Sequence, residues 1–104
     1  MHARVSRYEV PMDRIDDDIR QSQEIEPKVR AIAGSKGVYY FMDRATGHSM
    51  TVSLWETEAD MMAAADQARM LREELTGETG AKVTSVDEYE IVVMPSEIRT
   101  MMAA

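Results

Sequence analysis

The chain of 104 residues contains no cysteine. This absence excludes disulfides, thiol chemistry and cysteine-based metal sites, and it fits a reducing interior. No apolar run approaches the roughly 20 residues that a membrane span needs, and the first residues lack the apolar core of a signal peptide. We therefore expect a cytoplasmic protein that does not contact a membrane.

Positive charge is also scarce, because 12 Lys and Arg residues face 19 Asp and Glu residues, for a net charge of −7. Nucleic-acid binding draws much of its affinity from basic side chains that neutralise phosphates, so we exclude nucleic acid as a partner. A hydrophobic fraction of 44% with a charged fraction of 30% is typical of a folded globular chain. We find no repeat or linker, and we expect one domain over residues 1–94 followed by a tail over residues 95–104, which either forms a helical turn or frays.

Residues 37–57, with the sequence GVYYFMDRATGHSMTVSLWET, indicate a β-hairpin whose turn contains Gly47. If Asp43 lies opposite His48, Phe41 pairs with Met50, and side chains alternate between the two faces of the sheet. We expect the more apolar face to belong to the core and the other face to be mixed. The first face carries Tyr39, Phe41, Met50, Val52 and Leu54, and the second carries Val38, Tyr40, Met42, Ser49, Thr51, Ser53 and Trp55.

The remaining segments predict two strands and two helices. A short strand over residues 3–10 is closed by Pro11, and a helix follows from Asp13, which is a plausible cap. Pro27 either kinks this helix or divides it from a second short one that ends at Gly34. Thr57 caps the clearest helix, which we expect to stop at Thr76 and Gly77, and residues 82–94 alternate as the last strand.

The order strand, helix, strand, strand, helix, strand predicts an α+β, ferredoxin-like βαββαβ fold with a four-stranded antiparallel sheet. Right-handed crossovers place both helices on one face of this sheet. We expect the second face, with Val38, Tyr40, Met42 and Trp55, to be uncovered by the helices and too apolar to remain in water. A second copy of the chain is the natural cover, so we predict a homodimer.

From about Val5 to Val93 the chain resembles the dimeric α/β-barrel superfamily, in particular the antibiotic biosynthesis monooxygenase-like (ABM) domain. The resemblance is carried by the element order, by the segment SKGVYYF, by SLWETEADM with its Trp before a capped helix, and by EYEIVV. It implies a homodimer in which two sheets form a barrel with the helices outside. It also implies a pocket between helices and sheet in each subunit.

Members of this superfamily include cofactor-independent oxygenases of quinol-type aromatics, haem-degrading oxygenases and many proteins without an assigned reaction. The haem-degrading members use an Asn in the first strand, a Trp that ends the third strand and a His late in the second helix. Trp55 matches the Trp, whereas the chain has no Asn and residues 58–76 contain no His. The resemblance therefore does not extend to haem breakdown.

Five residues are candidates for ligand binding, and each has a structural alternative. Trp55 either stacks on a flat ligand or anchors helix to strand, and Tyr39 and Tyr40 either donate hydrogen bonds or fill the core or interface. Arg7, which we expect to point inward, either receives an anion or pairs with a carboxylate such as Glu90. His48 either titrates in a site or lies solvated in the turn. Tyr8 and Tyr89 are further phenols with the same alternatives, and the run Asp16, Asp17 and Asp18 reads as a solvated acidic face.

Two functional hypotheses from different classes follow. In the first, a homodimer binds a small, mostly apolar aromatic molecule between the helices and the sheet and oxidises it without metal, flavin or another cofactor. In the second, the chain is a non-catalytic dimerisation or ligand-sensing module whose cleft is filled by its own side chains. An open pocket of about 300 Å³ or more with convergent polar groups favours ligand binding. A third hypothesis, haem binding without breakdown, would depend on His48.

Overall fold

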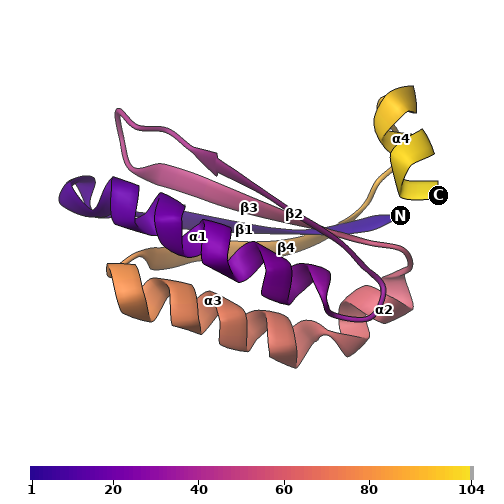
Figure 1. Cartoon of the computed structure of the whole chain (residues 1–104), viewed down its shortest axis with the longest axis horizontal. Helices are drawn as coiled ribbons and strands as arrows, with labels where there is room; N and C mark the ends of the chain where they lie inside the picture. The colour runs from indigo at the N-terminus through magenta and orange to yellow at the C-terminus, as the bar shows by residue number, and fades with distance from the viewer. Residues whose placement is uncertain (104) are drawn as a thin grey trace.

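The computed structural model describes residues 1–103 and the side chains of residues 1–100, so part of the predicted tail, Ala104, lies outside the described residues. One antiparallel sheet holds four strands in the order β2-β3-β1-β4. The helices α1 and α3 cover one face of the sheet, and α4 stands apart at the end of the molecule where both termini lie (Figure 1). The strands are β1 (His2–Glu9), β2 (Ser35–Met42), β3 (His48–Trp55) and β4 (Lys82–Glu90), and the helices are η1 (Met12–Arg14), α1 (Ile15–Arg30), α2 (Glu58–Ala63), α3 (Ala65–Thr79) and α4 (Ser96–Ala103).

This arrangement confirms the predicted α+β, ferredoxin-like fold. The first core cluster lies where α1 and α3 pack on the sheet, and the second surrounds Trp55 near α2. None of the helices within residues 1–103 combines the length and the apolar character needed to cross a bilayer.

The hairpin register is confirmed, because Tyr40 pairs with Thr51 and Phe41 with Met50. The prediction of its faces was wrong. Trp55 has no exposed surface and packs on the helix side with Met61, whereas Tyr39 and Phe41 are 47% and 49% exposed on the side without helices. Alternation shows which side chains share a face, but it does not show which of two apolar faces the helices cover.

The helix boundaries differ from the prediction at three places. The first helix begins at Ile15 and has no side-chain cap, so Asp13 does not serve as one. Pro27 lies inside the last turn of α1 and does not divide the helix, so of the two alternatives the second short helix was wrong. The following helix is split at Ala64 and continues through Gly77 until Gly80, whose φ of +75° ends it.

Other boundaries follow the sequence more closely. Thr57 caps α2, because its Oγ1 accepts a hydrogen bond of 3.0 Å from the amide of Asp60. The last strand ends at Glu90 instead of residue 94, and residues 96–103 of the tail form α4. Between them, Val92 and Val93 are 79% and 86% exposed, so the chain leaves the sheet there.

Gly47 closes the turn between β2 and β3 against the end of β1. Its carbonyl accepts a hydrogen bond of 2.8 Å from the amide of Val10, and its φ is +78°. A Cβ at this position would lie 2.3 Å from the carbonyl oxygen of Val10. Gly37 also has a positive φ, +97°, but a Cβ there would meet no atom within 4 Å.

We expect Gly47→Ala to destabilise the fold more than Gly37→Ala, which is the matched control. Gly37→Ala carries only the strain of a left-handed backbone, about 1–2 kcal/mol. Gly47→Ala adds a clash with backbone, for a total of about 3 kcal/mol. Urea denaturation of both variants measures the difference, and equal losses of unfolding free energy would contradict the packing described for this turn.

Candidate functional site

A cavity of about 350 Å³ lies between α1, α3 and the sheet. This volume is within the range of small-molecule sites, which are usually mostly apolar with a few placed polar groups. Strand residues form its floor and helix residues form its walls. The floor consists of Arg4, Ser6, Tyr8, Val38, Tyr40, Thr51, Ser53 and Trp55, and the walls consist of Ile19, Ser22, Gln23, Ile25, Glu26, Val29, Ala68, Leu71, Arg72 and Leu75.

Small residues create this space. Ser6, Thr51 and Ser53 stand on neighbouring central strands, and Ser6 pairs directly with Thr51. Their short side chains leave a gap above the sheet where larger apolar residues would otherwise meet the helices. Ala68 of α3 similarly leaves room in the wall. The mixed face of the hairpin thus becomes the floor of a cavity instead of a closed core.

Trp55 is held rigidly at one end of this floor. Its Nε1 donates a hydrogen bond of 2.9 Å to Ser53 Oγ, and the guanidinium carbon of Arg4 lies 5.8 Å from the centre of its ring. Arg4 over an aromatic ring is a cation–π contact. Trp55 therefore serves as a fully buried packing anchor at one end of the cavity.

Arg4 is the charged residue that sequence reasoning missed. It is only 4% exposed, and its Nη2 donates to the carbonyl of Met61 at 2.8 Å and to Glu88 Oε2 at 3.1 Å. Its Nη1 is buried and has no hydrogen-bond partner among the described residues. Strand alternation could have identified this residue, because Arg4 lies on the same face of β1 as Ser6 and Tyr8.

Arg7 does not point inward as predicted. It lies on the opposite face of β1, is exposed, and is 3.6 Å from Asp87 and not paired with Glu90. Because Arg7 has apolar neighbours in the sequence, we predicted a charge that points into the core. In the structure, solvent and the carboxylate on the edge strand satisfy this charge.

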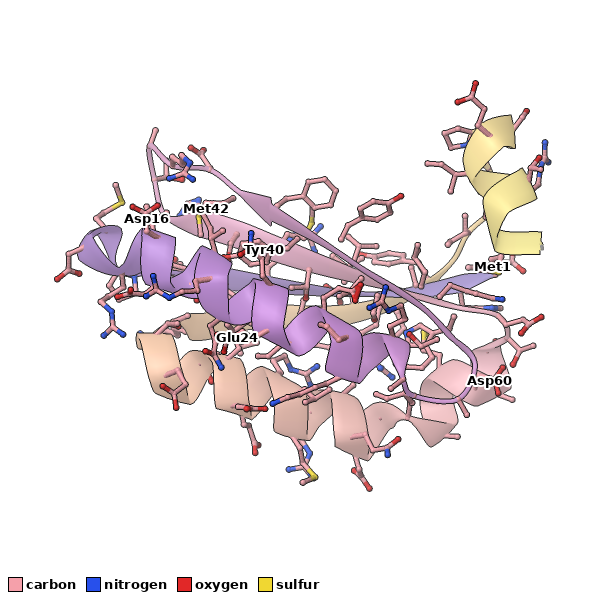
Figure 2. All side chains as sticks on the ribbon, in the orientation of Figure 1. Met1, Asp16, Glu24, Tyr40, Met42 and Asp60 are labelled. Atoms are coloured by element: carbon pink, nitrogen blue, oxygen red, sulfur yellow. The ribbon has the colours of Figure 1, made fainter. Side chains whose placement is uncertain are left out.

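Tyr40 is fixed by a hydrogen bond from its hydroxyl to Asp18 Oδ2, which links β2 to α1. Figure 2 shows Tyr40 on the side of the sheet next to α1. Asp18 is 1% exposed, so the prediction that Asp16, Asp17 and Asp18 form a solvated face was wrong for this residue. Burial, and then the hydrogen bond and charge of Asp18, raise the pKa of Tyr40 well above its ordinary value.

The second phenol of the cavity, Tyr8, is also buried and lies 3.3 Å from Thr51 Oγ1. Burial raises the pKa of Tyr8 as well. Both phenols therefore stay protonated at neutral pH. Neither phenol therefore acts as a base, and because the single O–H of Tyr40 already donates to Asp18, only Tyr8 could turn its proton towards a ligand.

The walls contribute two further charged groups. Arg72 of α3 lines the cavity and forms no salt bridge within the described part of the chain. Glu26 of α1 has one carboxylate oxygen 3.5 Å from Arg30, while Oε2 is buried without a partner among residues 1–100. The structure therefore surrounds an apolar space with neutral donors, two cations and one carboxylate.

The structure brings two of the five predicted binding residues, Trp55 and Tyr40, to this cavity. Tyr39 lies on the open face, 6.1 Å from the ring of Phe41. Arg7 and His48 line a separate, wider hollow of about 610 Å³ beside the hairpin. Within the described residues, no three His, Cys, Asp or Glu side chains gather as a metal-binding group.

No family model matches the sequence. Two curated relatives, the uncharacterized proteins MT2634 and Rv2557 of Mycobacterium tuberculosis, are each 29% identical over 108 residues. The alignment covers 100% of this chain and 46% of each relative, so the chain spans about half of their length.

Solved structures resemble the chain over nearly its whole length. A proposed antibiotic biosynthesis monooxygenase from Deinococcus radiodurans has a TM-score of 0.71 at 12% identity and covers 92% of this chain and 97% of its own. A proposed antibiotic biosynthesis monooxygenase from Bordetella bronchiseptica has a TM-score of 0.70 at 20% identity, with 88% and 97% covered. The chain has the ABM fold. This confirms the structural side of the resemblance seen in the sequence.

The same fold occurs in the haem degrader MhuD of Mycobacterium tuberculosis, whose structure contains two hemes in its active site. Its TM-score is 0.69 at 18% identity, and the match covers 92% of this chain and 100% of MhuD. The two histidines of the present chain, His2 and His48, are both absent from the described lining of the cavity. The described lining of this cavity therefore offers no imidazole group, and His48, on which haem binding would depend, lies outside it.

We expect Tyr40→Phe to change how stability depends on pH. The pKa of the Tyr40 phenol is raised in the folded protein above the unfolded value of about 10, so its contribution is complete below about pH 10 and is lost as the pH rises towards the folded value. The unfolding free energy of the wild type should fall more steeply above about pH 10 than that of the variant. The variant should also lose about 1.5–3 kcal/mol at neutral pH, because Asp18 loses a buried donor. Urea denaturation across this pH range measures both effects, and identical slopes would contradict them.

Proposed function

We propose that the protein binds a small aromatic or otherwise apolar molecule in the cavity between α1, α3 and the sheet. The observation that carries this proposal is an open cavity of about 350 Å³ into which polar groups converge. A cleft filled by its own side chains would have favoured a module without a ligand. Val38 and Leu71 offer apolar surface, while Tyr8 offers a hydroxyl group.

The reaction that we propose for this site is oxidation of an electron-rich aromatic ligand by O₂ without a cofactor. A deprotonated anthrone, for example, gives one electron to O₂, and the substrate radical and superoxide then form a carbon–oxygen bond. The resulting peroxide takes a proton from water, and the hydroperoxide loses water to leave a quinone. The protein would contribute burial, orientation and stabilisation of the anionic substrate. Arg4 and the neutral phenol of Tyr8 are the groups that would stabilise that anion.

Ala68→Trp tests the binding site, because the added indole would fill the cavity from α3. We expect calorimetric binding of 2-naphthol to weaken at least about tenfold, as a filled pocket no longer buries the ligand. Gln67→Trp is the matched control, since it adds the same side chain at an exposed position of α3. Equal binding by wild type and Ala68→Trp would place the ligand elsewhere and contradict the proposal.

Oxygen uptake separates the two functional hypotheses once binding has been measured. With a panel of anthrones and quinols, an oxygenase consumes O₂ above the rate without protein, and Ala68→Trp abolishes the excess. Uptake at background with normal binding would contradict the oxygenase and leave a ligand-sensing module.

We also propose that two copies pack through the open faces of their sheets. These faces carry Tyr39, Phe41, Met50, Val52 and Leu54, the side chains that the sequence had assigned to the core. Tyr89 of β4 extends the same face and is 49% exposed. Apolar groups of this size usually mark an interface. The sheet face without helices is therefore apolar, as the dimer proposal requires, but it carries the residues that the sequence had assigned to the core.

Phe41→Asp should convert this dimer into a monomer, because two carboxylates would be buried in one interface. Met70→Asp is the control, since Met70 is also an exposed apolar residue, at 62%, but lies on α3. Sedimentation velocity at micromolar concentration measures the mass of each. A wild-type monomer, or a dimer that Phe41→Asp leaves intact, would show that the sheet face is not the interface.

A further inference from the structure

The cavity contains polar atoms that the protein itself leaves unsatisfied. Arg4 Nη1, Ser22 Oγ and Glu26 Oε2 are all buried, all belong to residues that line the cavity, and none has a hydrogen-bond partner among the described residues. Buried polar groups are rarely left unpaired in a stable protein, because each costs about 1–3 kcal/mol. Three such atoms around one space indicate that a ligand completes the site.

The two cations define one side of this ligand. Arg4 is anchored by Met61 and Glu88 through Nη2, so its position is fixed while Nη1 stays buried without a hydrogen-bond partner among the described residues. Arg72 lines the same cavity from α3 and lacks a carboxylate partner among the described side chains. Burial lowers the pKa of Arg72, and the positive charge of Arg4 acts in the same direction. An anionic oxygen between the two guanidinium groups would relieve both effects.

The carboxylate of Glu26 defines a second contact. A carboxylate only accepts hydrogen bonds, so its free Oε2 requires a donor such as a hydroxyl group. Ser22 lies one turn earlier on α1 and lines the same wall, where its hydroxyl can accept or donate. The region between these polar groups is apolar, with Val38, Leu71 and the ring of Trp55.

We propose that the ligand is an aromatic hydroxy acid. Its ring lies against Val38 and Leu71, its carboxylate binds Arg4 Nη1 and the guanidinium of Arg72, and its hydroxyl donates to Glu26 Oε2. This assignment depends on the proposed binding function of the cavity, and it adds the chemical class and the orientation of the ligand.

Calorimetry with three related probes tests the assignment. 3-Hydroxy-2-naphthoate carries both polar groups, 2-naphthol lacks the carboxylate, and 2-naphthoate lacks the hydroxyl. We expect the wild type to bind the hydroxy acid about tenfold or more tightly than 2-naphthol, which is the usual effect of a hydrogen bond to a charged group. The preference over 2-naphthoate should be smaller but measurable.

Two variants assign these preferences to residues. Arg72→Gln should reduce the preference over 2-naphthol to about twofold, and Arg72→Lys should restore part of that preference. Glu26→Met should remove the preference over 2-naphthoate. The matched controls are Arg69→Gln on α3 and Glu24→Met on α1, which change exposed residues outside the cavity and should behave as wild type.

The outcomes separate this inference from the function on which it depends. Equal affinity for the hydroxy acid and 2-naphthol, with binding still lost in Ala68→Trp, would overturn the hydroxy-acid assignment while the cavity remains a binding site. An equal loss of preference in Arg69→Gln would also overturn it, because long-range charge would then be the cause. If none of the three probes binds the wild type, the proposed function fails together with the inference.

Discussion

The buried guanidinium of Arg4 is the interaction on which the site depends. A charge that is 96% removed from solvent is tolerated only when other groups bind it, and Arg4, with 4% of its surface exposed, meets this condition through three elements. It binds the carbonyl of Met61 in α2, the carboxylate of Glu88 in β4 and the face of Trp55 at the end of β3. These contacts fix one end of the cavity, and they leave Nη1 buried without a hydrogen-bond partner among the described residues. The same residue therefore stabilises the fold and prepares the site.

The rest of the cavity follows from the sizes of a few side chains. The short side chains of Ser6, Thr51 and Ser53 leave space above the sheet. The hydrogen bond from Tyr40 to Asp18 links β2 to α1 beside this space. Because burial raises the pKa of Tyr8, the site presents a neutral phenol beside cations, an arrangement suited to anionic oxygen. The fold alone does not specify this chemistry, since solved proteins with the ABM fold share only 12–20% identity with the chain in the three comparisons described above.

Sequence reasoning predicted the βαββαβ order, the hairpin register and the Thr57 cap, because each depends on local patterns within about twenty residues. It failed where a decision required knowledge of which elements pack together. The two faces of the hairpin were exchanged, Arg7 was taken as the inward charge, and Asp18 was assigned to a solvated surface. In each case a residue's partner lies far away in sequence: Arg4 meets Met61 and Glu88, and Asp18 meets Tyr40. Sequence reasoning identified Trp55 and Tyr40 because it searched the hairpin for a flat aromatic side chain and a phenol. It did not identify Glu26 and Arg72, because neither residue belongs to a distinguishing motif.

A crystal structure of the protein with 3-hydroxy-2-naphthoate is the most direct test of the central claim that this cavity is completed by a ligand. The account predicts density for the ring between α1, α3 and the sheet, with a carboxylate oxygen within hydrogen-bond distance of Arg4 Nη1. Density for the probe only on the open sheet face or in the hollow beside His48, with the cavity closed by the protein's own side chains, would contradict it.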